Sequence, residues 1–121
     1  MRLRALRGAV TVERNDAESI REGTEELLRE VMSRNELTPD DMVSCIFTCT
    51  PDLNAAFPAV AARGLGLDKV PLLCAREIDV PEALERVIRL MVHCYADEER
   101  RPQHVYLRDA ARLRRDLEGA Q

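Results

Sequence analysis

The sequence predicts a protein of the α+β class, because one segment has the periodicity of a helix and several short segments have the character of strands. Residues 17–34 carry apolar side chains every three to four positions with charged residues between them, as an amphipathic helix does. Residues 42–49 form a mostly apolar run that ends at Thr50-Pro51, as expected of a buried strand. A chain of 121 residues is long enough for one domain, residues 1–121, with a single hydrophobic core.

The N-terminal segment, residues 2–12, alternates at first and then becomes β-branched, which predicts a strand. Gly8 within it marks either a bulge or a close approach of another group to the backbone. Asn15-Asp16 provides an N-cap for the helix over residues 17–34. Thr38-Pro39 then predicts a short helical turn before the next strand.

The second half of the chain predicts shorter elements. A short helix begins at Phe57-Pro58 and ends at one of the two glycines that follow it. Residues 69–75 read as a strand, residues 96–103 as a charged loop and residues 104–107 as a short strand. About one turn of helix follows, and residues 115–121 are expected to be a flexible tail.

Residues 82–95 fit two interpretations. Their apolar side chains recur at helical spacing and Pro81-Glu82 resembles a helix start, so periodicity favours a helix. The same residues also alternate, with Arg89 and His93 on one face, as a strand would. Arg89 interrupts the apolar run 87–94, and a guanidinium is costly to bury unpaired. It therefore points either to solvent or to an anion.

Composition and charge exclude several classes of function. The net charge is −4, from 18 basic and 22 acidic residues, so the chain gains no long-range attraction to nucleic acid or to an anionic membrane. No apolar run is long enough to span a bilayer and no signal-peptide pattern is present, which predicts a cytoplasmic protein.

The four cysteines and two histidines are expected to be structural. Cys45, Cys49, Cys74 and Cys94 lie in apolar runs without a CxxC pair, so they read as small buried side chains rather than metal ligands. Cys74, which closes its run, is the best candidate to line a pocket. His93 and His104, in strand-like segments, read as core or interface histidines.

Arginines dominate the residues that could perform chemistry. The sequence has no glycine-rich phosphate loop, no nucleophile elbow and no HExxH motif. Arg7, Arg63, Arg89 and Arg114 lie in or beside predicted elements, and with Glu77 they would suit a small dianion that carries a hydroxyl. Such a pocket could promote a unimolecular rearrangement by holding a reactive conformer and stabilising developing charge. The alternative is that these arginines are scattered surface charges.

A family resemblance rests on short segments that occur in one register from residue 2 to about residue 117. They are Arg4-Ala5-Leu6-Arg7-Gly8-Ala9, Thr11-Val12-Glu13, Thr50-Pro51-Asp52-Leu53-Asn54-Ala55-Ala56-Phe57-Pro58-Ala59, Val70-Pro71, Cys74, Glu77-Ile78-Asp79-Val80, Ile88-Arg89 and His104-Val105-Tyr106-Leu107. Through them the chain resembles the monofunctional chorismate mutases of the Bacillus type.

The resemblance implies a fold, an assembly and a reaction. The subunit would be a mixed β-sheet packed by one long helix, and three subunits would form a pseudo-α/β barrel with an active site at each interface. The reaction would be the Claisen rearrangement of chorismate to prephenate, in phenylalanine and tyrosine biosynthesis, without a cofactor or a metal. Residues 86–94 would then form a strand rather than a helix.

The resemblance also implies roles for individual residues, with Arg89, Glu77, Cys74 and Arg7 as the catalytic set. Arg89 would bond the ether oxygen of the breaking bond and a carboxylate beside it, while Arg7 and Tyr106 would bind carboxylate. Glu77 and the Cys74 thiol would meet the ring hydroxyl. An apolar wall and two mouth-closing arginines complete the expected contacts: Phe57, Ala59, Leu72, Leu73, Leu113, Arg63 and Arg114.

Two departures and two rival functions accompany this resemblance. Val60 stands where the family often has a basic residue, which removes an outer electrostatic contact, and Leu73 replaces a smaller polar residue. The first rival is a trimeric relative that binds or deaminates small carboxylated enamines or imines through an interface arginine. The second is a non-catalytic sensor of small ligands, which no segment supports specifically.

Overall fold

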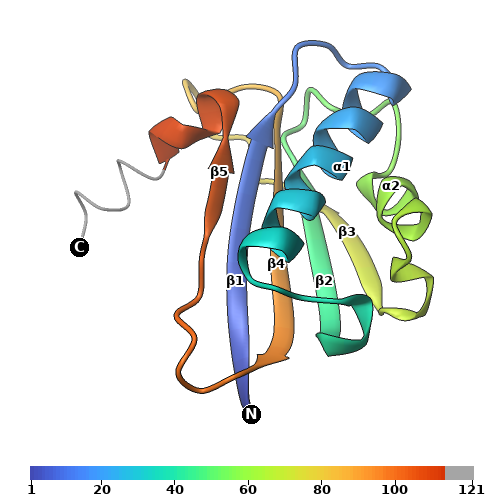
Figure 1. Cartoon of the computed structure of the whole chain (residues 1–121). Helices are drawn as coiled ribbons and strands as arrows, with labels where there is room; N and C mark the ends of the chain where they lie inside the picture. The colour runs from blue at the N-terminus through green and yellow to red at the C-terminus, as the bar shows by residue number, and fades with distance from the viewer. Residues whose placement is uncertain (114–121) are drawn as a thin grey trace.

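A five-stranded mixed sheet with helices on one face forms the part of the chain that the computed structural model describes, residues 1–113 (Figure 1). The strands are β1 (Arg2–Thr11), β2 (Met42–Cys49), β3 (Leu72–Arg76), β4 (Val87–Ala96) and β5 (Val105–Leu107). The helices are α1 (Ala17–Arg34), α2 (Pro58–Gly64) and the short 3-10 helices η1 (Pro39–Asp41), η2 (Leu67–Lys69) and η3 (Arg108–Ala110).

The strand order is β3-β2-β4-β1-β5, with β4 in the centre. β4 pairs antiparallel with β1 and with β2. The outer pairs, β2 with β3 and β1 with β5, are parallel. The predicted α+β class with a mixed sheet is therefore confirmed.

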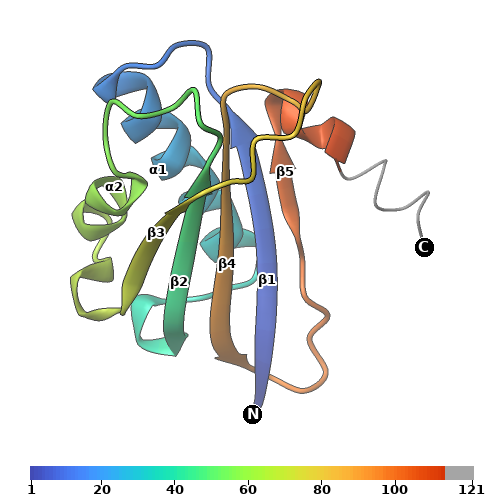
Figure 2. The same ribbon diagram turned by 180° about the vertical axis from the view of Figure 1, so that it is seen from behind.

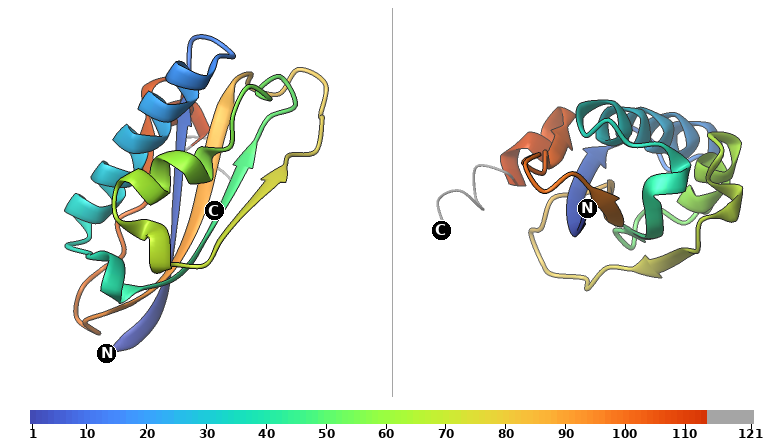
Figure 3. Two further views of the ribbon diagram at one scale, coloured as in Figure 1. Left: turned by 90° about the vertical axis from the view of Figure 1, so that its right-hand side faces the viewer. Right: turned by 60° about the horizontal axis from the view of Figure 1, so that its bottom comes forward.

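Both α-helices cover the same face of the sheet, and the other face is open. The core lies under α1, where Leu27, Leu28 and Val31 meet Val10 and Phe47, all of them fully buried. Figure 2 shows the opposite face, which we call the open face, with no helix in front of the strands; Figure 3 shows the helices on one side only. Four of the exposed large apolar side chains belong to the strands: Leu3, Val43, Leu73 and Tyr95.

The predicted helix over residues 17–34 is confirmed as α1, with the N-cap that the sequence indicates. Asp16 is extended, and its side-chain Oδ1 accepts a hydrogen bond of 2.7 Å from the Ser19 backbone N–H. That bond satisfies a donor that the first helical turn leaves without a partner. It also lowers the pKa of the Asp16 carboxyl.

The helical interpretation of residues 82–95 is wrong, and the expected strand over residues 86–94 is confirmed as β4. Glu82 and Arg86 have positive φ, 68° and 51°, so Pro81-Glu82 starts no helix. β4 is the central strand, and four of its side chains that face the helices are at most 3% exposed: Ile88, Leu90, Val92 and Cys94. The segment is a strand because it forms hydrogen bonds with β1 along one edge and with β2 along the other. Periodicity alone could not distinguish a helix from a strand here.

Two smaller expectations also change. β3 begins at Leu72 rather than at residue 69, because Leu67–Lys69 forms a 3-10 helix. Gly8 marks no bulge, since β1 pairs with β4 in continuous register. It marks the close approach instead: an added Cβ would lie 3.1 Å from Leu27 Cδ1 and 3.2 Å from Leu90 Cδ1.

Gly23 of α1 packs closely against Val12, the residue that follows β1, and an alanine at position 23 is expected to destabilise the protein. An added Cβ would lie 2.5 Å from Val12 Cγ1, and Val12 is buried. Helix propensity favours alanine by about 1 kcal/mol, but we expect overpacking to outweigh it and to lower the free energy of unfolding by about 1–3 kcal/mol. Thermal unfolding followed by circular dichroism measures the difference.

Gly64→Ala is the matched control, because an added Cβ at this last residue of α2 meets nothing within 4 Å. It should leave the unfolding temperature unchanged or raise it. Equal unfolding temperatures for Gly23→Ala and the parent protein would contradict the packing argument.

Two sequence-based expectations fall on residues without a described position. Arg114 and the predicted tail over residues 115–121 lie outside the described residues. Among residues 1–113, no helix has the length and apolarity needed to cross a membrane.

Candidate active site

Arg89 lies on the open face, at the centre of a row of side chains that crosses the whole sheet. Its pairing partners are Thr48 in β2 and Ala9 in β1, and paired residues point to the same face. Ala75 pairs with Thr48, and Tyr106 pairs with Ala9. The Arg89 side chain is 44% exposed, so it reaches out of its apolar run over this face.

Glu77 is the anion that Arg89 meets. Arg89 Nε lies 3.1 Å from Glu77 Oε2, and the Thr48 hydroxyl donates a 2.7 Å hydrogen bond to the same oxygen. The Glu77 backbone N–H donates to the Cys49 carbonyl at 2.9 Å, which holds the residue just past the end of β3. Nε of Arg89 makes this ion pair, and within residues 1–113 the two terminal nitrogens of Arg89 form no hydrogen bond with another residue.

Arg7 and Tyr106 flank Arg89 on the same face. Arg7 pairs with Met91, two residues along the strands from the Ala9–Arg89 pair and therefore on the same face. Its backbone N–H donates a 3.0 Å hydrogen bond to His104 Nδ1, which requires that nitrogen to be unprotonated. No carboxylate within residues 1–113 pairs with the Arg7 guanidinium. Tyr106 and Leu113 pack against a small apolar cluster that contains Ala9.

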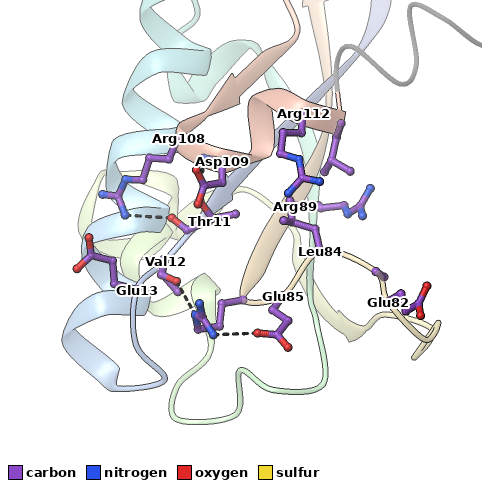
Figure 4. A pocket seen from close by; sticks show the side chains of 13 residues that line it. Thr11, Val12, Glu13, Glu82, Leu84, Glu85, Arg89, Arg108, Asp109 and Arg112 are labelled. Atoms are coloured by element: carbon purple, nitrogen blue, oxygen red, sulfur yellow. Dashed lines mark hydrogen bonds and ion pairs between the residues drawn. The ribbon is translucent and has the colours of Figure 1, made fainter.

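An open pocket of about 800 Å³ extends from Arg89 toward the end of the sheet. The loop between β3 and β4 and the segment after β5 form its walls (Figure 4). Arg86 and Arg108 brace these walls through hydrogen bonds to backbone carbonyls, Arg86 Nε to Val12 at 3.1 Å and Arg108 Nη1 to Thr11 at 3.0 Å. The lining residues are Thr11, Val12, Glu13, Glu82, Ala83, Leu84, Glu85, Arg86, Arg89, Arg108, Asp109, Arg112 and Leu113.

The other predicted site residues form a second group around α2 and β3. Cys74 pairs with the buried Phe47, packs against the core and lines a separate pocket of about 530 Å³ with Phe57. Cys74 and Glu77 are three residues apart in extended chain, so their side chains leave opposite faces. Within one chain they cannot meet the same hydroxyl.

The second group offers mostly exposed surface. Phe57 is 70% exposed at the start of α2, and Arg63 is exposed in its last turn. Leu72 is half-buried on the helix side, whereas Leu73 is 61% exposed on the edge strand. Ala59 is only 5% exposed, so its side chain belongs to the core.

Three of the four cysteines, Cys45, Cys49 and Cys94, lie in an environment that suppresses their reactivity. All four are free thiols. Burial, with a smaller contribution from Cys74, raises the pKa of Cys45 and of Cys49 to about 12. Burial also raises the pKa of Cys94. A thiol is a nucleophile only as thiolate, so these three stay inert near neutral pH. Within residues 1–113, no group of three or more His, Cys, Asp or Glu side chains could hold a metal ion.

Sequence reasoning missed Thr48 and the contact made by His104. Thr48 lies in an otherwise apolar strand, and alternation could have placed it on the face of Arg89 only if the register of β2 against β4 were known. His104 was expected in a core or an interface, and its bond to the Arg7 backbone depends on the parallel pairing of β5 with β1. No local pattern indicates either partner.

An arginine held by a hydrogen-bonded carboxylate, Arg89 beside Glu77, in a pocket that further arginines line, is typical of a protein that binds a small carboxylated molecule. Comparison with known proteins specifies the family. Residues 3–117 match the family described as chorismate mutase type I. The chain belongs to this family.

Known relatives cover nearly the full chain. Chorismate mutase AroH of Thermus thermophilus is 48% identical over 121 residues, which cover 98% of this chain and 99% of the relative. Chorismate mutase AroH of Bacillus subtilis is 41% identical over 119 residues, which cover 97% of this chain and 94% of that relative. A chorismate mutase structure from Clostridium thermocellum is 48% identical and superimposes with a TM-score of 0.87, covering 89% of this chain and 97% of that one. The chain is a chorismate mutase, an isomerase of aromatic amino acid biosynthesis.

Proposed function

We propose that the chain converts chorismate into prephenate by holding a reactive conformer and stabilising the charge that develops on the ether oxygen. The observation that carries this proposal is the Arg89–Glu77 pair. Glu77 holds Arg89 at Nε and leaves both terminal nitrogens of the guanidinium for a ligand. A donor that is already oriented needs no reorganisation when the charge appears.

The reaction needs little else from the protein. In the rearrangement a carbon–carbon bond forms while the carbon–oxygen bond breaks, and the electrons move within one molecule. No proton or hydride has to be supplied, so no cofactor is proposed. Arg89 would donate to the ether oxygen, where negative charge grows, and to a carboxylate beside it. Arg7 and Tyr106 would hold carboxylate from the neighbouring strands.

Glu77 would serve two purposes at once. Its Oε2 holds Arg89 and accepts the Thr48 hydrogen bond, while Oε1 has no partner among the described residues. Oε1 would accept the ring hydroxyl of the substrate. Leu113 would contribute to the apolar wall on the same side.

We further propose that the active enzyme is a homotrimer whose sites lie between subunits. Cys74 would meet the ring hydroxyl from one subunit and Glu77 from the next, because the two face opposite ways within one chain. The open face, with its exposed apolar side chains, would pack inside the assembly. Phe57, Ala59, Arg63, Leu72 and Leu73 would come with Cys74, and Arg63 and Arg114 would close the mouth.

We place this enzyme in the cytoplasm. The four cysteines are free thiols, which agrees with a reducing compartment. Chorismate and prephenate are the proposed small-molecule partners, with neither nucleic acid nor membrane.

The decisive test is direct. Purified full-length protein is incubated with chorismate, and loss of the ultraviolet absorbance of chorismate is followed while sedimentation reports the assembly. We expect rapid loss of absorbance and formation of prephenate. An intact trimer that leaves chorismate unchanged would contradict the proposed reaction.

A further inference from the structure

Arg112 reaches into the same pocket as Arg89, although nothing in the sequence singled it out. It follows η3, in the turn of helix that precedes the end of the described chain. Arg112 and Arg89 both line the 800 Å³ pocket. Figure 4 shows the Arg112 guanidinium directed down from its helical turn toward Arg89.

Arg112 differs from the other arginines of this pocket because it has no carboxylate. Arg86 pairs with Glu85 at 3.2 Å, and Arg108 pairs with Glu26 at 2.7 Å. Arg89 pairs with Glu77. Within residues 1–113, no carboxylate lies in ion-pairing distance of Arg112 and no hydrogen bond holds its side chain.

Two guanidinium groups directed into one pocket repel each other unless an anion lies between them. Toward residues 1–113, the terminal nitrogens of Arg89 and all donors of Arg112 form no hydrogen bond. Each guanidinium attracts a carboxylate through its positive charge, so the two arginines together attract a dicarboxylate more strongly than either arginine alone. The acidic residues that also line the pocket would repel an anion. The positive charge of Arg112 offsets part of this repulsion.

We propose that Arg112 is a further substrate-binding residue, which captures a carboxylate of the dianionic substrate at the mouth of the pocket and passes the ligand to Arg89. This inference rests on the proposed function. Because Arg112 is exposed, it acts through charge and contributes to association rather than to the chemical step. Arg112 would supply a positive charge at the mouth of the pocket. Val60, exposed on α2 where the family often has a basic residue, supplies none.

Initial rates with chorismate at low and at moderate ionic strength test the proposal. We expect Arg112→Gln to lower kcat/KM about fivefold at low ionic strength and to leave kcat within about twofold, as for the loss of one exposed ion pair. Added salt should reduce the difference in kcat/KM between Arg112→Gln and wild type, because mobile ions screen exposed charges. Calorimetric titration with prephenate should show a matching loss of affinity.

Two further variants make the test specific. Arg112→Lys keeps the charge, and its kcat/KM should stay within about twofold of wild type, since capture needs a cation rather than a fork. Arg29→Gln, on the exposed surface of α1, changes the net charge equally and should have no effect.

Several results would overturn this role for Arg112. They are an unchanged kcat/KM in Arg112→Gln at low salt, an equal loss in Arg29→Gln, or a loss confined to kcat. A wild-type protein without mutase activity would instead contradict the proposed function itself. An active wild type beside an equally active Arg112→Gln variant contradicts only the inference about Arg112.

Discussion

Replacing Arg89 by alanine is expected to lower kcat by about 10²–10³ or more, the usual effect of removing one preorganised donor to a developing oxyanion. The residue sits in the central strand but its side chain points to the open face, so the core beneath it should not be disturbed. Rates with saturating chorismate measure kcat, and sedimentation with circular dichroism confirms that the variant is folded and assembled.

Arg89→Lys should also lose most of the activity. The single ammonium of lysine cannot bond Glu77 on one side and present two further donors to the ligand on the other. Arg29→Ala, on the outer surface of α1, serves as the control and should keep normal turnover. Near-normal turnover of a folded Arg89→Ala variant would remove this residue from the mechanism.

The second large effect is a recovery of activity when two inactive variants assemble together. Arg89→Ala damages the group of residues on the open face, and Arg63→Glu places an anion in the group around α2. Each variant alone should be nearly inactive, in the second case because a like charge opposes the dianion. If each site takes one group from each of two subunits, mixed trimers contain some sites with both groups intact.

The expected recovery follows from counting combinations. In a random one-to-one mixture, an interface has both groups intact when the Arg63→Glu subunit supplies the open face and the Arg89→Ala subunit supplies α2. This occurs at about a quarter of the interfaces, so about a quarter of wild-type activity should return. The two variants are co-expressed or reassembled, and chorismate turnover is measured against each parent. A mixture no more active than its parents would contradict sites shared between subunits.

The elements that the sequence predicted well are those whose pattern is local. The α1 helix shows its period and its charged outer face within its 18 residues, and its N-cap Asp16 directly precedes them. The apolar run of β2 ends at a proline, as its bounds in the structure confirm. In such segments, propensity, burial and capping all favour the same conformation.

Residues 82–95 show where local pattern fails. Their side chains satisfy helical and strand spacing together, and only the two neighbouring strands decide in favour of β4. The resemblance to known sequences resolved the conflict in advance, because it carries information about the fold that periodicity lacks.

The sequence by itself determined that an arginine in an apolar run must meet solvent or an anion. It also indicated a set of candidate residues: Arg7, Arg63, Arg89, Arg114 and Glu77. The tertiary structure decided what Arg89 and Glu77 face. It paired Arg89 with Glu77 and Thr48, and it set Cys74 on the opposite face from Glu77. The physical reason is that these contacts depend on the register between strands distant in sequence, and register follows from the packing of the whole sheet.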